Sequence, residues 1–111
     1  MYEIYLAVHF LRQLKSLLKK YPGLTDDLIK QLKDFNKDLV TPLGHKLYKL
    51  RLKSSDLPRG KSKSFRVIVF LWEFRNTLIP ITIYFKGNTE NINQKDLEYH
   101  LAVILQEIEN E

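Results

Sequence analysis

The chain has 111 residues, of which 44% are hydrophobic and 28% charged, a composition typical of one globular domain and too apolar for a disordered tail. Lys and Arg (18) outnumber Asp and Glu (13), and the absence of Cys excludes a disulfide scaffold, a Cys-type zinc site and a cysteine nucleophile. The longest apolar run, residues 67–72, is far shorter than the roughly 20 residues that span a bilayer. The N-terminus does not resemble a secretory signal, so we expect a cytoplasmic protein without a membrane partner. We expect residues 1–111 to form a single domain that uses no metal or other cofactor.

The N-terminal third of the chain favours a short strand over residues 2–6, followed by two amphipathic helices. The first helix is expected to end at Pro22-Gly23, because both residues terminate helices. Thr25 is the expected N-cap of the second helix, where Asp26 and Asp27 complement the positive end of the helix dipole. The two apolar stripes are Phe10, Leu14, Leu17, Leu18 and Tyr21, and then Leu24, Leu28, Leu32, Phe35 and Leu39.

The middle of the chain indicates three strands, over residues 46–53, 65–74 and 78–85, which alternate in polarity or are rich in β-branched and aromatic residues. Residues 75–77 predict a short hairpin connection between the last two strands. Pro80 falls inside the last strand and cannot donate a ladder hydrogen bond, so we expect it at a sheet edge or at a bulge.

A third amphipathic helix is predicted near the C-terminus, with Asn93 as its N-cap. The resulting order β-α-α-β-β-β-α predicts an α+β domain with one mostly antiparallel sheet. The two N-terminal helices are expected to pack together on one side of it. The apolar stripe of the third helix is Leu97, Leu101, Ile104, Leu105 and Ile108.

Charge is unevenly distributed along the chain. Residues 44–66 hold eight Lys and Arg residues against Asp56 alone, whereas residues 87–111 hold six acidic residues against Lys95 alone. A basic segment beside an acidic tail indicates a face that binds a polyanion, although exposed lysines are also common on ordinary solvated surfaces.

The alternation of residues 46–53 places basic side chains on one face of a strand. Lys49 and Arg51 lie two residues apart on it, and Arg66, early in the next strand, is expected to present its guanidinium as a polar group on the same face. Arginine offers two parallel donors to phosphate oxygens, and lysine supplies a point charge or, where neighbouring cations lower its pKa, a base. Because RNA carries its own nucleophile, the 2′-hydroxyl, a metal-free basic sheet that performs chemistry favours RNA over DNA.

Three segments resemble the RelE/ParE superfamily of bacterial toxins: GHKLYKLRLKSSD at residues 44–56, GKSKSFRVI at 60–68 and ITIYFK at 81–86. The expected element order matches as well, so the resemblance implies one RelE/ParE-like toxin domain over residues 1–111. RelE-like members are ribosome-dependent endoribonucleases that cut mRNA without a metal and are neutralised by a cognate antitoxin. ParE-like members share the fold and inhibit DNA gyrase.

The resemblance assigns roles to individual residues. It implies Lys49, Arg51 and Arg66 as catalytic residues, while the family's C-terminal arginine and tyrosine fall at Gly87 and Asn93 here.

Three hypotheses follow: a RelE-like endoribonuclease, a ParE-like gyrase inhibitor, or a catalytically degenerate member that only binds an antitoxin. The acid–base candidates are Tyr84 and His100, and the substrate-binding candidates are Lys46, Lys53, Arg59, Lys61, Lys63 and Lys86.

Overall fold

Five strands form one sheet with the spatial order β1-β5-β4-β3-β2 in the computed structural model, which describes residues 1–56, 64–86 and 91–111. Only β1 pairs in parallel, with β5, and the other pairs are antiparallel. The predicted α+β class with a mostly antiparallel sheet is therefore confirmed. The strands are β1 (Glu3–Ile4), β2 (Thr41–Gly44), β3 (Leu47–Leu52), β4 (Phe65–Trp72) and β5 (Thr77–Phe85), and the helices are α1 (Val8–Leu18), α2 (Leu24–Lys33) and α3 (Gln94–Glu109).

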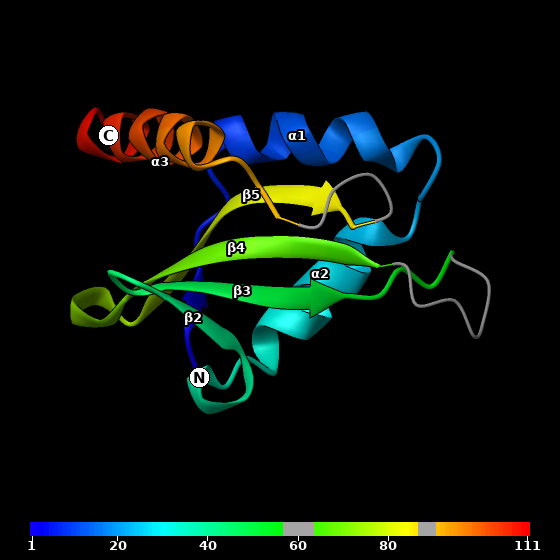
Figure 1. Cartoon of the computed structure of the whole chain (residues 1–111), viewed down its shortest axis with the longest axis horizontal. Helices are drawn as coiled ribbons and strands as arrows, with labels where there is room; N and C mark the ends of the chain where they lie inside the picture. The colour runs from blue at the N-terminus through cyan, green and yellow to red at the C-terminus, as the bar shows by residue number, and fades with distance from the viewer. Residues whose placement is uncertain (57–63, 87–90) are drawn as a thin grey trace.

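The three helices cover different parts of the sheet. Figure 1 shows α1 and α3 side by side next to β5, while α2 lies behind the sheet and packs against β3. Helix α1 also contacts α2, as predicted for the two N-terminal helices. No helix in the three described ranges is long and apolar enough to cross a membrane.

The core includes buried residues of all three helices, and one part of it lies between α2 and the face of the sheet that carries the apolar residues of β3. Phe65 of β4 is fully buried there, with its ring centroid 4.9 Å from that of Tyr21 and 5.2 Å from that of Phe85. Alternation along β3 buries Leu50 and Leu52 on this face and turns the basic residues to the other. The predicted two faces of this strand are confirmed.

Helix α2 differs from its prediction at both ends. It begins at Leu24 with Gly23 at the N-cap, so the expected cap at Thr25 is wrong. The carboxylate of Asp56 accepts a hydrogen bond from the Gly23 N–H (2.9 Å), and the helix starts two residues earlier than a cap at Thr25 implies. The helix ends at Lys33, and Leu39 is 82% exposed in a separate 3₁₀ turn (Lys37–Leu39), so its predicted place on the apolar stripe is also wrong.

Strand β2 is absent from the predicted order, because Pro42 and Gly44 give residues 41–44 the composition of a loop. As an edge strand β2 tolerates Pro42, since one side of its backbone needs no partner. His45 and Lys46 adopt left-handed conformations (φ 54° and 65°) and form a two-residue hairpin into β3. The observed order is therefore β-α-α-β-β-β-β-α.

Strand β4 is shorter than predicted and ends at Trp72. Residues Glu73–Arg75 form a 3₁₀ turn that leaves Phe74 93% exposed.

Pro80 lies at a bulge in β5, as expected for a proline in an interior strand. The register between β4 and β5 shifts there, because Val69 pairs with Pro80 whereas Ile68 pairs with Thr82. The helix N-cap at Asn93 is also confirmed, because its side chain accepts a hydrogen bond from the Lys95 N–H (2.8 Å).

Gln13 of α1 satisfies polar groups beside this bulge. Its Nε2 donates to the Ile81 carbonyl (3.0 Å), and its Oε1 accepts from the Thr82 hydroxyl (2.7 Å). We expect Gln13→Leu to lower the free energy of unfolding by about 1–3 kcal/mol, because a part-buried carbonyl and hydroxyl lose their partners. Urea unfolding measures this loss. Gln13→Glu keeps the acceptor and loses the donor, so its free energy of unfolding should lie between those of the wild type and Gln13→Leu. If both variants were as stable as the wild type, the hydrogen bonds of Gln13 to Ile81 and Thr82 would not stabilise the bulge.

Candidate functional site

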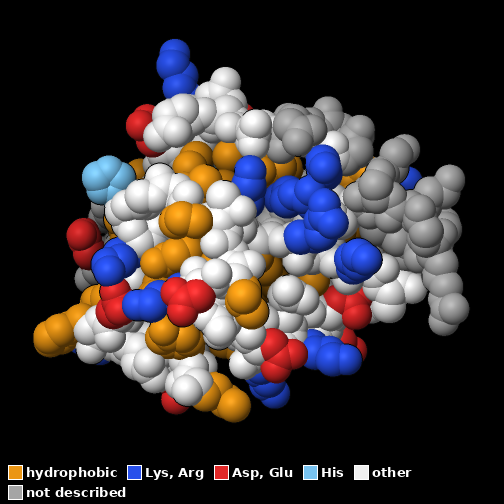
Figure 2. All heavy atoms as spheres, turned by 60° about the horizontal axis from the view of Figure 1, so that its bottom comes forward, with side chains coloured by type: hydrophobic (Ala, Val, Ile, Leu, Met, Phe, Trp, Pro, Cys, Tyr) orange, Lys and Arg blue, Asp and Glu red, His pale blue; other side chains and the backbone are white. Residues whose placement is uncertain are grey.

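Three basic side chains lie together on the face of the sheet opposite α2. Arg51 of β3 sits directly across from Arg66 of β4, and Lys49 lies two residues before Arg51 on the same face. These three residues, here called the basic cluster, line a cavity of about 270 Å³ with Thr41 and Leu50. Figure 2 shows Lys and Arg side chains gathered on one face of the molecule. No described residue lining this cavity is acidic, so it suits an anion.

Arg66 is the most constrained member of the basic cluster. It is 8% exposed, which differs from the open polar position expected from the sequence, because β4 is an interior strand of the sheet. Its guanidinium Nη1 donates to the Ser64 hydroxyl and to the Phe65 carbonyl (3.4 Å). These bonds hold the side chain in place while other guanidinium N–H groups remain for a ligand.

Lys49 connects the basic cluster to the segment before α3. Its Nζ donates to Oδ1 of Asn91 (3.0 Å), a residue that no sequence pattern singles out. Asn91 also lines a second cavity, of about 640 Å³, between β5 and α3. The side chains that line it include Thr82, Tyr84, Asp96 and His100. Tyr84 pairs across the strands with Arg66, so both acid–base candidates lie in the cavity beside the basic cluster.

His100 has a partner that the sequence does not reveal. Its Nδ1 lies 2.8 Å from Nε2 of His9 on α1, a hydrogen bond between residues 91 positions apart. Burial lowers the pKa of His100 below its ordinary value, the neighbouring imidazole of His9 lowers it further because two adjacent rings resist carrying a proton at the same time, and the carboxylate of Asp96 opposes both. His100 is therefore mainly neutral near neutral pH.

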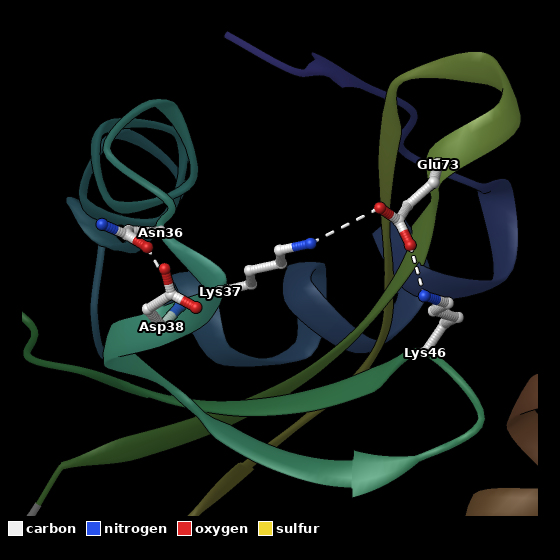
Figure 3. A network of polar contacts seen from close by, with 5 residues as sticks. All are labelled: Asn36, Lys37, Asp38, Lys46 and Glu73. Carbon is white, nitrogen blue, oxygen red and sulfur yellow. Dashed lines mark hydrogen bonds and ion pairs between the residues drawn. The ribbon is translucent and has the colours of Figure 1, made fainter.

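Lys46 is not brought into the basic cluster. It precedes β3 at the end away from Arg51, and its Nζ pairs with the carboxylate of Glu73, which lies 3.6 Å from Nζ of Lys37 as well (Figure 3). The hydrogen bond from Lys46 lowers the pKa of Glu73 and raises that of Lys46 itself. Beside them, Asn36 caps the 3₁₀ turn by accepting from the Asp38 N–H (2.9 Å). Lys46 therefore joins two turns and is not among the residues that line the anion cavity.

The other substrate-binding candidates are placed differently. Lys53 is exposed just beyond the end of β3, and the backbone N–H of Lys86 donates to the Ser64 carbonyl (2.9 Å), beside the start of β4. Both therefore flank the Arg66 end of the cluster. Arg59, Lys61, Lys63 and Gly87 lie outside the described residues. Among the residues that are described, no group of three or more His, Asp or Glu side chains is placed to hold a metal ion.

Comparison with known proteins identifies the fold. No protein-family model and no curated protein matches the sequence. Among solved structures, the chain is similar to the Escherichia coli toxin RelE in its free state, in a variant with two arginines changed to alanine. The TM-score is 0.54 and the identity 17%, over 80% of this chain and 87% of that one. The chain therefore has a RelE-like fold, as its sequence segments predict.

Proposed function

We propose that this chain is the toxin of a type II toxin–antitoxin system, a RelE-like endoribonuclease that cleaves mRNA on the ribosome without a metal ion. The observation that carries the proposal is the pairing of Arg51 with Arg66 across two strands, with Lys49 beside them over an anion-sized cavity. The RelE-like fold is consistent with it. The toxin would act in the cytoplasm, where translating ribosomes present the mRNA.

The basic cluster suits a reaction that needs charge stabilisation. The 2′-oxygen of a ribose attacks the adjacent phosphorus, the bond from phosphorus to the 5′-oxygen breaks, and the products are a 2′,3′-cyclic phosphate and a 5′-hydroxyl. Lys49 promotes the attack by stabilising negative charge that develops on the 2′-oxygen. Arg51 and Arg66 donate to the phosphorane oxygens, for which their planar guanidinium groups are suited.

The rigidity of Arg66 adds to this function. A donor that is already oriented toward the developing charge needs no reorganisation during the reaction, so it stabilises the transition state more than a mobile surface cation. Arg66 is held by Ser64 and by the Phe65 carbonyl in the interior of the sheet. Arg51, which is exposed, supplies the neighbouring donor from the solvent side.

A cognate antitoxin is the expected protein partner. An enzyme that destroys mRNA has to be silenced, and the eight basic residues among positions 44–66 favour an acidic segment that folds on docking. Because such a partner binds the folded toxin and not the unfolded chain, co-expression should raise the thermal stability of the toxin.

The test is to add the purified chain to translating ribosomes and map cleavage of the mRNA. We expect cuts in ribosome-bound mRNA that persist in the presence of a metal chelator at a concentration that leaves the ribosomes intact. Naked mRNA under the same conditions is the control and should be cut far more slowly. Intact mRNA together with inhibited DNA gyrase supercoiling would overturn the proposal in favour of the ParE-like hypothesis. Intact mRNA with active gyrase would favour the member that only binds an antitoxin.

A further inference from the structure

A pair of histidines joins α1 to α3 beside the proposed active site. The ring centroids of His9 and His100 are 5.0 Å apart, and Tyr99 packs edge-on against both rings. Glu107 of α3 fixes the start of α1, since its carboxylate accepts from the backbone N–H of Val8 (2.8 Å) and of His9 (3.2 Å). The two helices therefore hold the imidazoles in a defined arrangement.

The arrangement leaves one ring nitrogen of His100 for the larger cavity. His100 lines that cavity together with Asp96, one helical turn earlier, and its Nδ1 is occupied by His9. Only its Nε2 is then available to a ligand. The cavity adjoins the basic cluster through Asn91, which binds Lys49 Nζ, and through Tyr84, which pairs with Arg66. A ribose whose phosphate lies on the basic cluster can therefore extend toward His100.

The basic cluster has no proton acceptor of its own. Arginine stays protonated in proteins, so Arg51 and Arg66 only donate. Nζ of Lys49 likewise acts as a donor in its contact with Oδ1 of Asn91. Attack by a 2′-hydroxyl nevertheless releases a proton, which needs a base within reach.

Resting on the proposed endoribonuclease function, we propose that Nε2 of His100 is the general base and that His9 is its positioning residue. In this arrangement Nδ1–H of His100 donates to Nε2 of His9, which leaves the Nε2 lone pair of His100 facing the substrate. That lone pair takes the proton of the 2′-hydroxyl as the bond from the 2′-oxygen to phosphorus forms. The bond to the 5′-oxygen breaks, the leaving oxygen takes a proton from water, and the resulting hydroxide takes from His100 the proton that came from the 2′-hydroxyl, which returns His100 to its neutral form.

The charged surroundings favour this role at neutral pH. The titratable groups that face the pair are Asp96, Tyr99 and Glu107 on α3 and Tyr84 on β5. Because the pKa of His100 is lowered by burial and by His9, the neutral form persists below the ordinary histidine value. The cleavage rate should therefore be constant above that pKa and fall as the pH drops through it, since protonated His100 cannot accept a proton.

Four variants test the proposal in the full chain on translating ribosomes. His100→Ala should lower the single-turnover cleavage rate about a hundredfold or more. His9→Leu should lower it about tenfold or more, because His100 loses the acceptor that fixes its tautomer. His9→Gln, whose side-chain oxygen can accept the same hydrogen bond, should restore most of the rate. His45→Asn is the control, since His45 is exposed in a left-handed turn that Asn tolerates, and it should match the wild type.

NMR of the imidazole nitrogens tests the pair without any activity. We expect His100 to carry its proton on Nδ1 in the wild type and in His9→Gln, and on Nε2 in His9→Leu. A wild type that cleaves mRNA while His100→Ala cleaves equally fast would overturn the general base, and a wild-type His100 protonated on Nε2 would overturn the positioning role. A wild type that cleaves nothing but shows the Nδ1 tautomer would instead refute the proposed function.

Discussion

Replacing Lys49 and Arg51 together by Gln should lower mRNA cleavage on the ribosome by about a hundredfold or more while the protein stays folded. A pre-organised donor to the charge of a transition state typically contributes about 2.7–4 kcal/mol. The two losses need not add, because Lys49 and Arg51 act on one reacting phosphate. Both side chains are at least partly exposed, so their removal opens no cavity in the core. The free energy of unfolding should change by about 0.5 kcal/mol or less for each.

The matched control removes two positive charges from the other side of the sheet. Lys30 and Lys33 are exposed on α2, which packs against the opposite face from the basic cluster. Changing both to Gln alters the net charge by the same amount as the Lys49 and Arg51 pair, so it measures any general effect of charge on ribosome binding. Equal losses in the two double variants would contradict a specific role for the cluster. Arg66 is less suitable for this comparison, because its burial would mix lost stability with lost activity.

The arrangement of the basic cluster could be predicted from the sequence because it depends on a period of two. Alternation from Leu47 to Leu52 fixes which residues of β3 face the core, and Lys49 and Arg51 are then forced to the other face. The position of Pro80 at a bulge follows equally from chemistry, since proline lacks the N–H that an interior strand needs. Local rules of this kind do not depend on distant parts of the chain.

Features that depend on tertiary contacts could not be predicted in this way. Strand β2 forms because β3 offers a free edge, not because its sequence favours a strand. Leu39 continues the helical period of α2, but the chain leaves that helix after Lys33, so the period persists by chance. The contact between His9 and His100 joins residues 91 positions apart, and no spacing in the sequence encodes it.

Phe65→Ala should lower the free energy of unfolding by about 3–5 kcal/mol, the loss typical of a fully buried phenylalanine. Phe65 contacts the rings of Tyr21 and Phe85 edge-on, and such aromatic pairs contribute beyond the apolar area they bury. It also begins β4, immediately before Arg66, so its loss loosens the strand that holds the buried guanidinium. A domain of this size should lose more than about 10 °C in Tm, measured by calorimetry or circular dichroism.

Two further substitutions test whether the loss of stability comes from the burial of Phe65 and not from the removal of a phenylalanine as such. Phe65→Leu keeps most of the buried volume and should recover part of the lost stability, because the remaining cavity is smaller. Phe74→Ala removes a ring that is 93% exposed in the turn after β4, and it should change the free energy of unfolding by about 0.5 kcal/mol or less. Equal destabilisation by Phe65→Ala and Phe74→Ala would mean that the Tyr21–Phe65–Phe85 cluster does not hold the start of β4. In that case the fixed position of Arg66 would depend on its bonds to Ser64 and the Phe65 carbonyl alone.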